Sequence, residues 1–211
     1  MKKIILLFFF IFSSLLSFSS HFMGGELTWI CLKGGPNVGQ YVFELKVYRD
    51  CDGITFSQTA LTVTQHNYPT LGATSPILMN FISVSDISPV GYSSGASTSC
   101  FDCAGITGAA LGAVEEYIWR SDPVAFAGNP PPEGWHFIWG GGTRSGQITN
   151  ILDPDAQSWT LRAVMYPYDS DPTTAINYLA SSPCYDSSPR FKELAKTIIC
   201  TGYPFAYSHN A

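Results

Sequence analysis

Three short stretches of the chain each place two aspartates two positions apart, which is a spacing that suits calcium. They are Asp50-Cys51-Asp52-Gly53, Asp153-Pro154-Asp155 and Asp169-Ser170-Asp171. Ca²⁺ binds oxygen ligands, and turns rich in Asp present side-chain and backbone oxygens together. The alternative is that these aspartates cap their own backbone, as Asp commonly does in turns, and no stretch matches an EF-hand loop. The candidate calcium ligands are Asp50, Asp52, Asp169 and Asp171, and the sequence implies no other cofactor.

Six cysteines form the second group of reactive side chains: Cys31, Cys51, Cys100, Cys103, Cys184 and Cys200. In an exported chain they predict disulfides, but the sequence does not choose among the pairings. Cys100 and Cys103 supply half of a zinc site, and no second half follows. A thioredoxin-like pair belongs at a helix start in a βαβ unit. A disulfide within this loop, or to a partner such as Cys51, is the favoured interpretation.

The chain carries no pattern that predicts an enzyme. There is no Gly-x-Ser-x-Gly elbow, and the four histidines are scattered. The stretch Gly140–Gly146 lacks the lysine of a phosphate-binding loop, and no helix is expected after it. We interpret that stretch as a hairpin turn, and we expect no catalytic residue.

Aromatic residues alternate along 135–139. Trp135, Phe137 and Trp139 fall on one face of an expected strand, with His136 and Ile138 on the other. A row of three rings predicts a core face. An exposed platform for sugars or partner proteins is the alternative.

The first residues indicate export. Met1-Lys2-Lys3 precedes an apolar run over 4–12 and a serine-rich stretch, which is the layout of a signal peptide. Small residues at Ser17 and Ser19 fit the −3 and −1 positions, so we expect cleavage after Ser19. The alternative is a membrane anchor, but the apolar run is shorter than the roughly 20 residues that span a bilayer. Loss of Lys2 and Lys3 leaves 9 of the 11 basic residues against 16 acidic ones. Such an acidic chain is a poor nucleic-acid binder, and we expect no membrane span after cleavage.

Strand patterns and Gly/Pro turns dominate the mature chain. The predicted strands are 26–32, 40–49, 60–66, 77–84, 114–119, 135–139, 147–151 and 159–166. The first two form an expected hairpin around Gly34–Asn37. A short helix over 109–116 is an alternative to the start of the predicted strand 114–119. Many short strands between such turns favour an all-β, antiparallel, immunoglobulin-like sandwich. The long small-residue stretch 93–112 is the expected contact loop.

Composition also suggests a domain organisation. Residues 1–19 are the expected signal peptide and 20–182 the β-sandwich domain. The Ser/Pro-rich stretches around Cys184 and Pro189 predict that 183–211 is a linker with the first strands of a truncated second β-sandwich module.

Several motifs resemble one group of exported proteins. They are 21–29 (HFMGGELTW), 39–41 (GQY), 48–53 (YRDCDG), 134–137 (GWHF), 161–166 (LRAVMY), 188–191 (SPRF) and 200–205 (CTGYPF). With these motifs the chain resembles the amino-terminal region of large secreted, gliding-motility-associated, type IX-secreted surface proteins. The resemblance implies further immunoglobulin-like or cadherin-like modules and a carboxy-terminal sorting domain. Relatives often carry paired cysteines where this chain has Gly140–Arg144.

We therefore expect a non-catalytic module of a large adhesin-like protein, secreted or at the cell surface. Its expected partners are surface proteins or glycans and further β modules of the same polypeptide. A carbohydrate-binding module and a secreted hydrolase accessory domain are the alternatives, because the fold does not decide function.

Overall fold

The computed structural model describes residues 22–50, 56, 60–66, 76–87, 114–126, 130–144, 148–167, 184 and 187–191. Within them the chain is all-β, with one turn of 3-10 helix, η1 (Pro154–Ala156). The strands are β1 (Phe22–Cys31), β2 (Tyr41–Asp50), β3 (Ala60–His66), β4 (Ile77–Asp86), β5 (Val114–Ser121), β6 (Trp135–Thr143) and β7 (Ser158–Met165). All strand pairs of the sheet are antiparallel.

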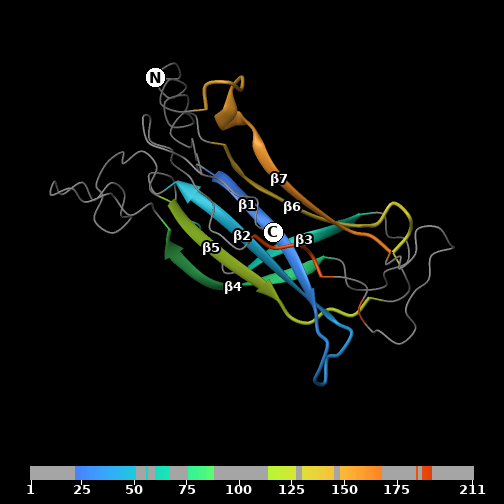
Figure 1. The fold of residues 1–211 in the computed structure, drawn as a ribbon. Helices are drawn as coiled ribbons and strands as arrows, with labels where there is room; N and C mark the ends of the chain where they lie inside the picture. The colour runs from blue at the N-terminus through green and yellow to red at the C-terminus, as the bar shows by residue number, and fades with distance from the viewer. Residues whose placement is uncertain are drawn as a thin grey trace, which may run out of the picture.

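The strands follow the order β1-β2-β5-β4-β3-β6-β7, and β3 connects two parts of the sheet. Its first half pairs with β4, where Leu61 lies opposite Met79. Its second half pairs with β6, where Thr64 lies opposite Ile138. Because one strand serves both neighbours, the sheet curls, and β6 and β7 come to lie beside β1 (Figure 1).

The core lies between these two parts of the sheet and consists largely of aromatic rings. Phe137 of β6 packs on Phe43 of β2 at 4.6 Å between ring centroids and on Trp29 of β1 at 5.9 Å. Phe22 and Trp139 make a similar pair at 5.5 Å. Alternating side chains on facing strands supply these rings, so the all-β, antiparallel prediction is confirmed.

The two ends of the sheet nearly meet, which makes the fold barrel-like. Trp159 Nε1 of β7 donates to the carbonyl oxygen of Phe22 in β1 at 2.9 Å. Phe22 also forms an isolated parallel bridge with Arg144, directly after β6. The described strands therefore form one nearly closed sheet, which is a coarser result than the expected immunoglobulin-like sandwich.

Close approach at this junction requires a glycine. A Cβ on Gly25 would overlap the carbonyl oxygen of Lys46 and lie 2.9 Å from Leu161 Cδ1. Gly24, one position earlier, has ordinary space: its nearest contact would be Tyr48 Cδ2 at 3.9 Å. The two glycines of the 21–29 motif thus differ in role, and Gly25 allows β1 to lie against both β2 and β7.

The expected hairpin between the first two strands is confirmed. Leu27 pairs with Leu45 and Trp29 with Phe43, and a turn over 34–39 connects the strands. Gly35 and Gly39 both adopt a positive φ, at 80° and 82°. That backbone conformation disfavours side chains, which explains the glycines in this turn.

Three local predictions are wrong. Within the predicted strand 147–151, residues 149–151 form a turn and a bend that lead toward η1, and Asp153 before η1 lies in the left-handed region at φ 46°. Residues 140–143 are not a turn but the end of β6. Of the helix over 109–116, residues 114–116 belong to β5, where Val114 pairs with Asp50 of β2; the rest lies outside the described residues.

The glycines of β6 have a packing reason. Gly141 pairs with Trp159 of β7, and a Cβ on it would stand 2.9 Å from the ring of Trp139. The register shifts between Gly141 and Thr143, with Gly142 at φ 65°. The glycines at 140–142, which were predicted to form a turn, are therefore the bulged end of a strand, and their lack of side chains leaves room for the indole ring of Trp139.

Candidate functional site

The outer face of β1, β2 and β5 carries a row of ion pairs and hydrogen bonds. Arg120 donates to Glu44 Oε2 through Nη2 at 2.5 Å and through Nε at 3.2 Å. Lys46 Nζ lies 3.4 Å from Glu116 Oε2. The Glu44 side chain is only 8% exposed, although Arg120 is half exposed. These opposite charges face each other across neighbouring strands, so they stabilise the sheet rather than offer a free carboxylate to a ligand.

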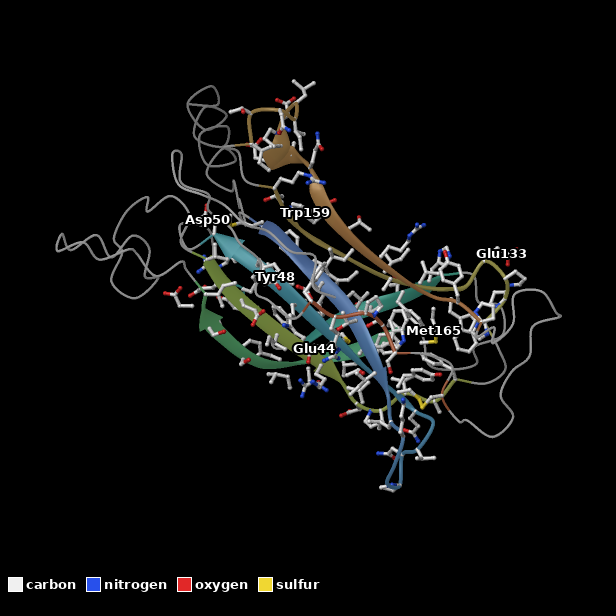
Figure 2. The ribbon with its side chains drawn as sticks, in the orientation of Figure 1. Glu44, Tyr48, Asp50, Glu133, Trp159 and Met165 are labelled. Atoms are coloured by element: carbon white, nitrogen blue, oxygen red, sulfur yellow. A yellow bond between two sulfur atoms is a disulfide. The ribbon has the colours of Figure 1, made fainter. Side chains whose placement is uncertain are left out.

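Tyr48 extends this row toward β1. Its hydroxyl donates to Glu26 Oε1 at 2.7 Å, and Figure 2 shows Tyr48 on the same strand as Glu44. Burial raises the pKa of the Tyr48 phenol well above its ordinary value, and the nearby carboxylates of Glu26 and Glu116 raise it further. The phenol is therefore a hydrogen-bond donor throughout the neutral range and unsuited to act as a base.

A second cluster lies on the inner face at the end of β2. Arg49, 2% exposed, pairs with Glu115 of β5, with Nε 3.0 Å from Oε2, and Tyr117 donates to the same oxygen at 3.0 Å. Burial, then Glu115, raises the pKa of Tyr117, while Arg49 opposes this effect. Arg49 also donates to the carbonyl oxygen of Asp50. The buried guanidinium of Arg49 is thus neutralised by Glu115, as a buried charge requires for stability.

The edge of β1 holds a distant segment of the chain. We call residue 184 together with 187–191 the edge segment; it runs beside β1 in red in Figure 1. A disulfide joins Cys31 to Cys184 across 153 positions. Ser188 donates from its backbone N to the carbonyl oxygen of Trp29 at 3.1 Å, and its hydroxyl accepts from the Trp29 N–H at 2.8 Å.

Two further contacts extend this attachment. The Cys31 N–H donates to Ser187 Oγ at 3.2 Å. Arg190 Nη1 lies 3.7 Å from Glu44 Oε1, so Glu44 faces arginines from β5 and from the edge segment. This docking could not be predicted from the sequence, because contacts between positions so far apart leave no local pattern. Its one signal was the Ser-Ser-Pro stretch at 187–189.

The predicted calcium ligands divide into one described residue and three others. Asp50 ends β2, is buried, and pairs through its backbone with Val114. Asp52, Asp169 and Asp171 lie outside the described residues. Within the described part of the chain, no three His, Cys, Asp or Glu side chains gather as metal ligands. The calcium site stays a prediction.

Cysteines divide similarly. Cys31 and Cys184 form the disulfide described above. The other candidates, Cys51, Cys100, Cys103 and Cys200, lie outside the described ranges, as does the expected contact loop over 93–112. The prediction that the chain carries disulfides is confirmed for this one pair.

The aromatic row of β6 belongs to the core. Trp135, Phe137 and Trp139 are all buried, while His136 and Ile138 on the other face are partly exposed. His136 Nε2 lies 3.0 Å from the carbonyl oxygen of Glu133. The core interpretation is confirmed, and these rings do not form a surface platform.

A different apolar surface is exposed, on β4. We call its side chains the β4 patch; they are Leu78, Phe81, Ile82 and Val84. Leu78 pairs with Thr62 and is 53% exposed, next to the buried Met79. A register shift between Phe81 and Ser83 interrupts the alternation. Phe81 and Val84 lie opposite Trp119 and Tyr117 of β5, and Phe81 packs against both of these rings, so the patch follows β4 along its length and is not a single face. Several exposed apolar side chains on one strand are typical of an interaction surface.

Comparisons with known proteins add no family. No protein-family model matches the chain, and neither a curated protein nor a solved structure matches it. The described residues include no helix of sufficient length and apolar character to cross a membrane. The fold therefore defines a class, a nearly closed antiparallel sheet with a disulfide-bound edge segment.

Proposed function

We propose that this chain is a non-catalytic module of an exported, adhesin-like protein that mediates attachment or recognition at the cell surface. The proposal rests on the β4 patch, because its large apolar side chains stay substantially exposed to solvent. An apolar surface favours a protein partner over a glycan, whose recognition relies on polar contacts and ring stacking.

Export is supported by the disulfide. The Cys31–Cys184 bond belongs to compartments where thiols oxidise. The signal-like start of the chain and the motifs shared with type IX-secreted surface proteins agree with export. We retain that family, an immunoglobulin-like relationship and further β modules as part of the proposal.

A carbohydrate-binding module has less support. Trp29, Trp119, Trp135 and Trp139 are buried. Trp159 is partly buried, and the guanidinium of Arg144 stacks over its ring at 4.1 Å. None of these indoles offers the open ring face that a sugar would need.

The test is binding of the purified exported chain to intact cells of the producing organism, measured by flow cytometry with a fluorescent label. Leu78→Ser with Ile82→Ser should reduce bound chain about tenfold, the loss typical of removing apolar anchors from an interface. Val38→Ser is the matched control, because Val38 is similarly exposed but lies in the β1–β2 turn. Equal binding by both variants would contradict the proposal, and glycan-array binding that both retain would favour the carbohydrate alternative.

A further inference from the structure

The edge of β1 that does not pair with β2 is occupied by the edge segment. In a strand, the backbone N–H and C=O groups of alternate residues point to the same side. Leu32 exchanges bonds with the β2 side of the hairpin, through Gly39 and Gln40. Trp29 and Cys31 therefore direct their backbone groups away from β2, toward the edge segment.

The edge segment meets these groups with hydroxyls more than with backbone. Both the Trp29 and Cys31 amides donate to serine Oγ atoms, and the Ser188 hydroxyl lies 3.2 Å from the Trp29 carbonyl oxygen. A backbone-to-backbone bond from Ser188 to Trp29 also joins the segment to β1. The segment is thus joined to β1 by both side-chain and backbone hydrogen bonds. Its position depends on the Cys31–Cys184 disulfide and on the longer contact of Arg190 with Glu44.

The segment itself does not present a new edge. Pro189 lacks an N–H and is exposed, and Arg190 and Phe191 after it are exposed as well. Natural sheets protect edge strands with proline and charge, because an open edge pairs with other chains. The segment therefore has the residue types that protect the edge of a sheet.

We propose that the edge segment is a disulfide-anchored guard that keeps the β1 edge closed to strand addition by a second copy of this chain. The β1 edge is self-complementary: in an antiparallel pair of two copies, Trp29 of one would exchange both backbone bonds with Cys31 of the other. The two Ile30 side chains would then lie directly opposite each other. Ile30 is 37% exposed, so this contact would bury apolar surface.

The experiment compares the full exported chain with a guard-release variant that combines Cys31→Ala, Cys184→Ala and Ser188→Pro. These changes remove the disulfide, the Ser188 hydroxyl and its N–H together. Phe191→Ser is the control, since it alters an exposed end of the segment and none of these bonds. Amide hydrogen exchange at Trp29 and residue 31 is measured at low concentration, and mass by light scattering is measured over a concentration series.

The proposal expects at least about tenfold faster exchange at both amides in the release variant, with a concentration-dependent dimer, while wild type and control stay protected and monomeric. Ile30→Cys added to the release variant should give a covalent dimer under mild oxidation, and in the wild-type background it should not. Unchanged exchange overturns the proposal, and so does faster exchange with a monomer at every concentration. If the release variant lacks native tryptophan fluorescence, Cys31→Ala with Cys184→Ala, with Ser188 retained, is measured by the same criteria.

Discussion

The indole of Trp159 donates a hydrogen bond to the backbone carbonyl of Phe22, 2.9 Å away and 137 positions earlier in the chain. The same two residues also pack ring against ring, with centroids 5.1 Å apart in an edge-on arrangement. Figure 2 shows Trp159 at the start of β7, near the beginning of β1. This pair joins the first and last strands of the sheet, so it closes the fold at one end of the junction.

Trp159→Phe should weaken that closure. Phenylalanine keeps an aromatic ring against Phe22 but removes the N–H, and a partly buried carbonyl without its donor costs about 1–3 kcal/mol. We expect a decrease of about 1–2 kcal/mol in the free energy of unfolding, measured by urea denaturation. Tyr166→Phe, which removes a hydroxyl from an exposed ring, is the control and should change little. Equal stability of the two variants would show that the indole bond contributes nothing.

Gly25→Ala should destabilise the protein far more than Gly24→Ala. The new methyl at position 25 meets the carbonyl of Lys46 on β2, and backbone does not yield as a flexible side chain does. Forced overpacking costs typically about 1–3 kcal/mol, and we expect the upper part of that range. At position 24 the nearest contact is ordinary, at 3.9 Å. Thermal unfolding of both variants measures the difference, and similar midpoints would contradict the tight approach of β1 to β2 at Gly25.

The sequence predicted the parts of this fold that depend on neighbouring residues. Alternation of Trp135, Phe137 and Trp139 predicted a core face, and the turn after Cys31 predicted a hairpin. It did not predict Gly140–Thr143 as strand, because glycine is read locally as a turn, whereas its reason here is the indole of Trp139.

Long-range contacts explain the other differences. The pairing of Cys31 with Cys184 and the position of Arg190 beside Glu44 depend on how the sheet curls. A linear pattern contains no information on that curvature. The calcium prediction was drawn from local aspartate spacing. Of its four residues, Asp50 lies within the described ranges and the other three lie outside them, so the prediction is untested.

Glu44→Gln should destabilise the sheet although it barely changes shape. Glu44 is buried and accepts two hydrogen bonds from Arg120, and the amide of glutamine retains one acceptor oxygen but no charge. Because Arg120 is half exposed, water replaces part of the lost interaction, and we expect about 1–2 kcal/mol in urea unfolding.

Glu133→Gln is the matched control for that substitution. Glu133 is exposed beside the start of β6, well away from Glu44 in Figure 2. Surface changes of this kind usually stay within about 0.5 kcal/mol. If both substitutions fall in that range, the Glu44 ion pairs contribute to position and not to stability.

Alkaline pH should destabilise the fold through Tyr48. In the unfolded chain a tyrosine ionises near its ordinary pKa of 10.0, whereas burial and the adjacent carboxylates raise the pKa of Tyr48 in the fold. A group whose folded pKa is raised contributes stability that is complete below the unfolded value, so the free energy of unfolding should fall as pH rises past that value. Tyr117, whose pKa is raised in the same direction, adds to the slope. Urea unfolding from about pH 8 to about pH 11 measures this decline.

Tyr48→Phe should be less stable near neutral pH, because it lacks the bond to Glu26, and its decline with pH should be shallower. A parallel decline in the two proteins would show that Tyr48 ionises as readily in the fold as in the unfolded chain.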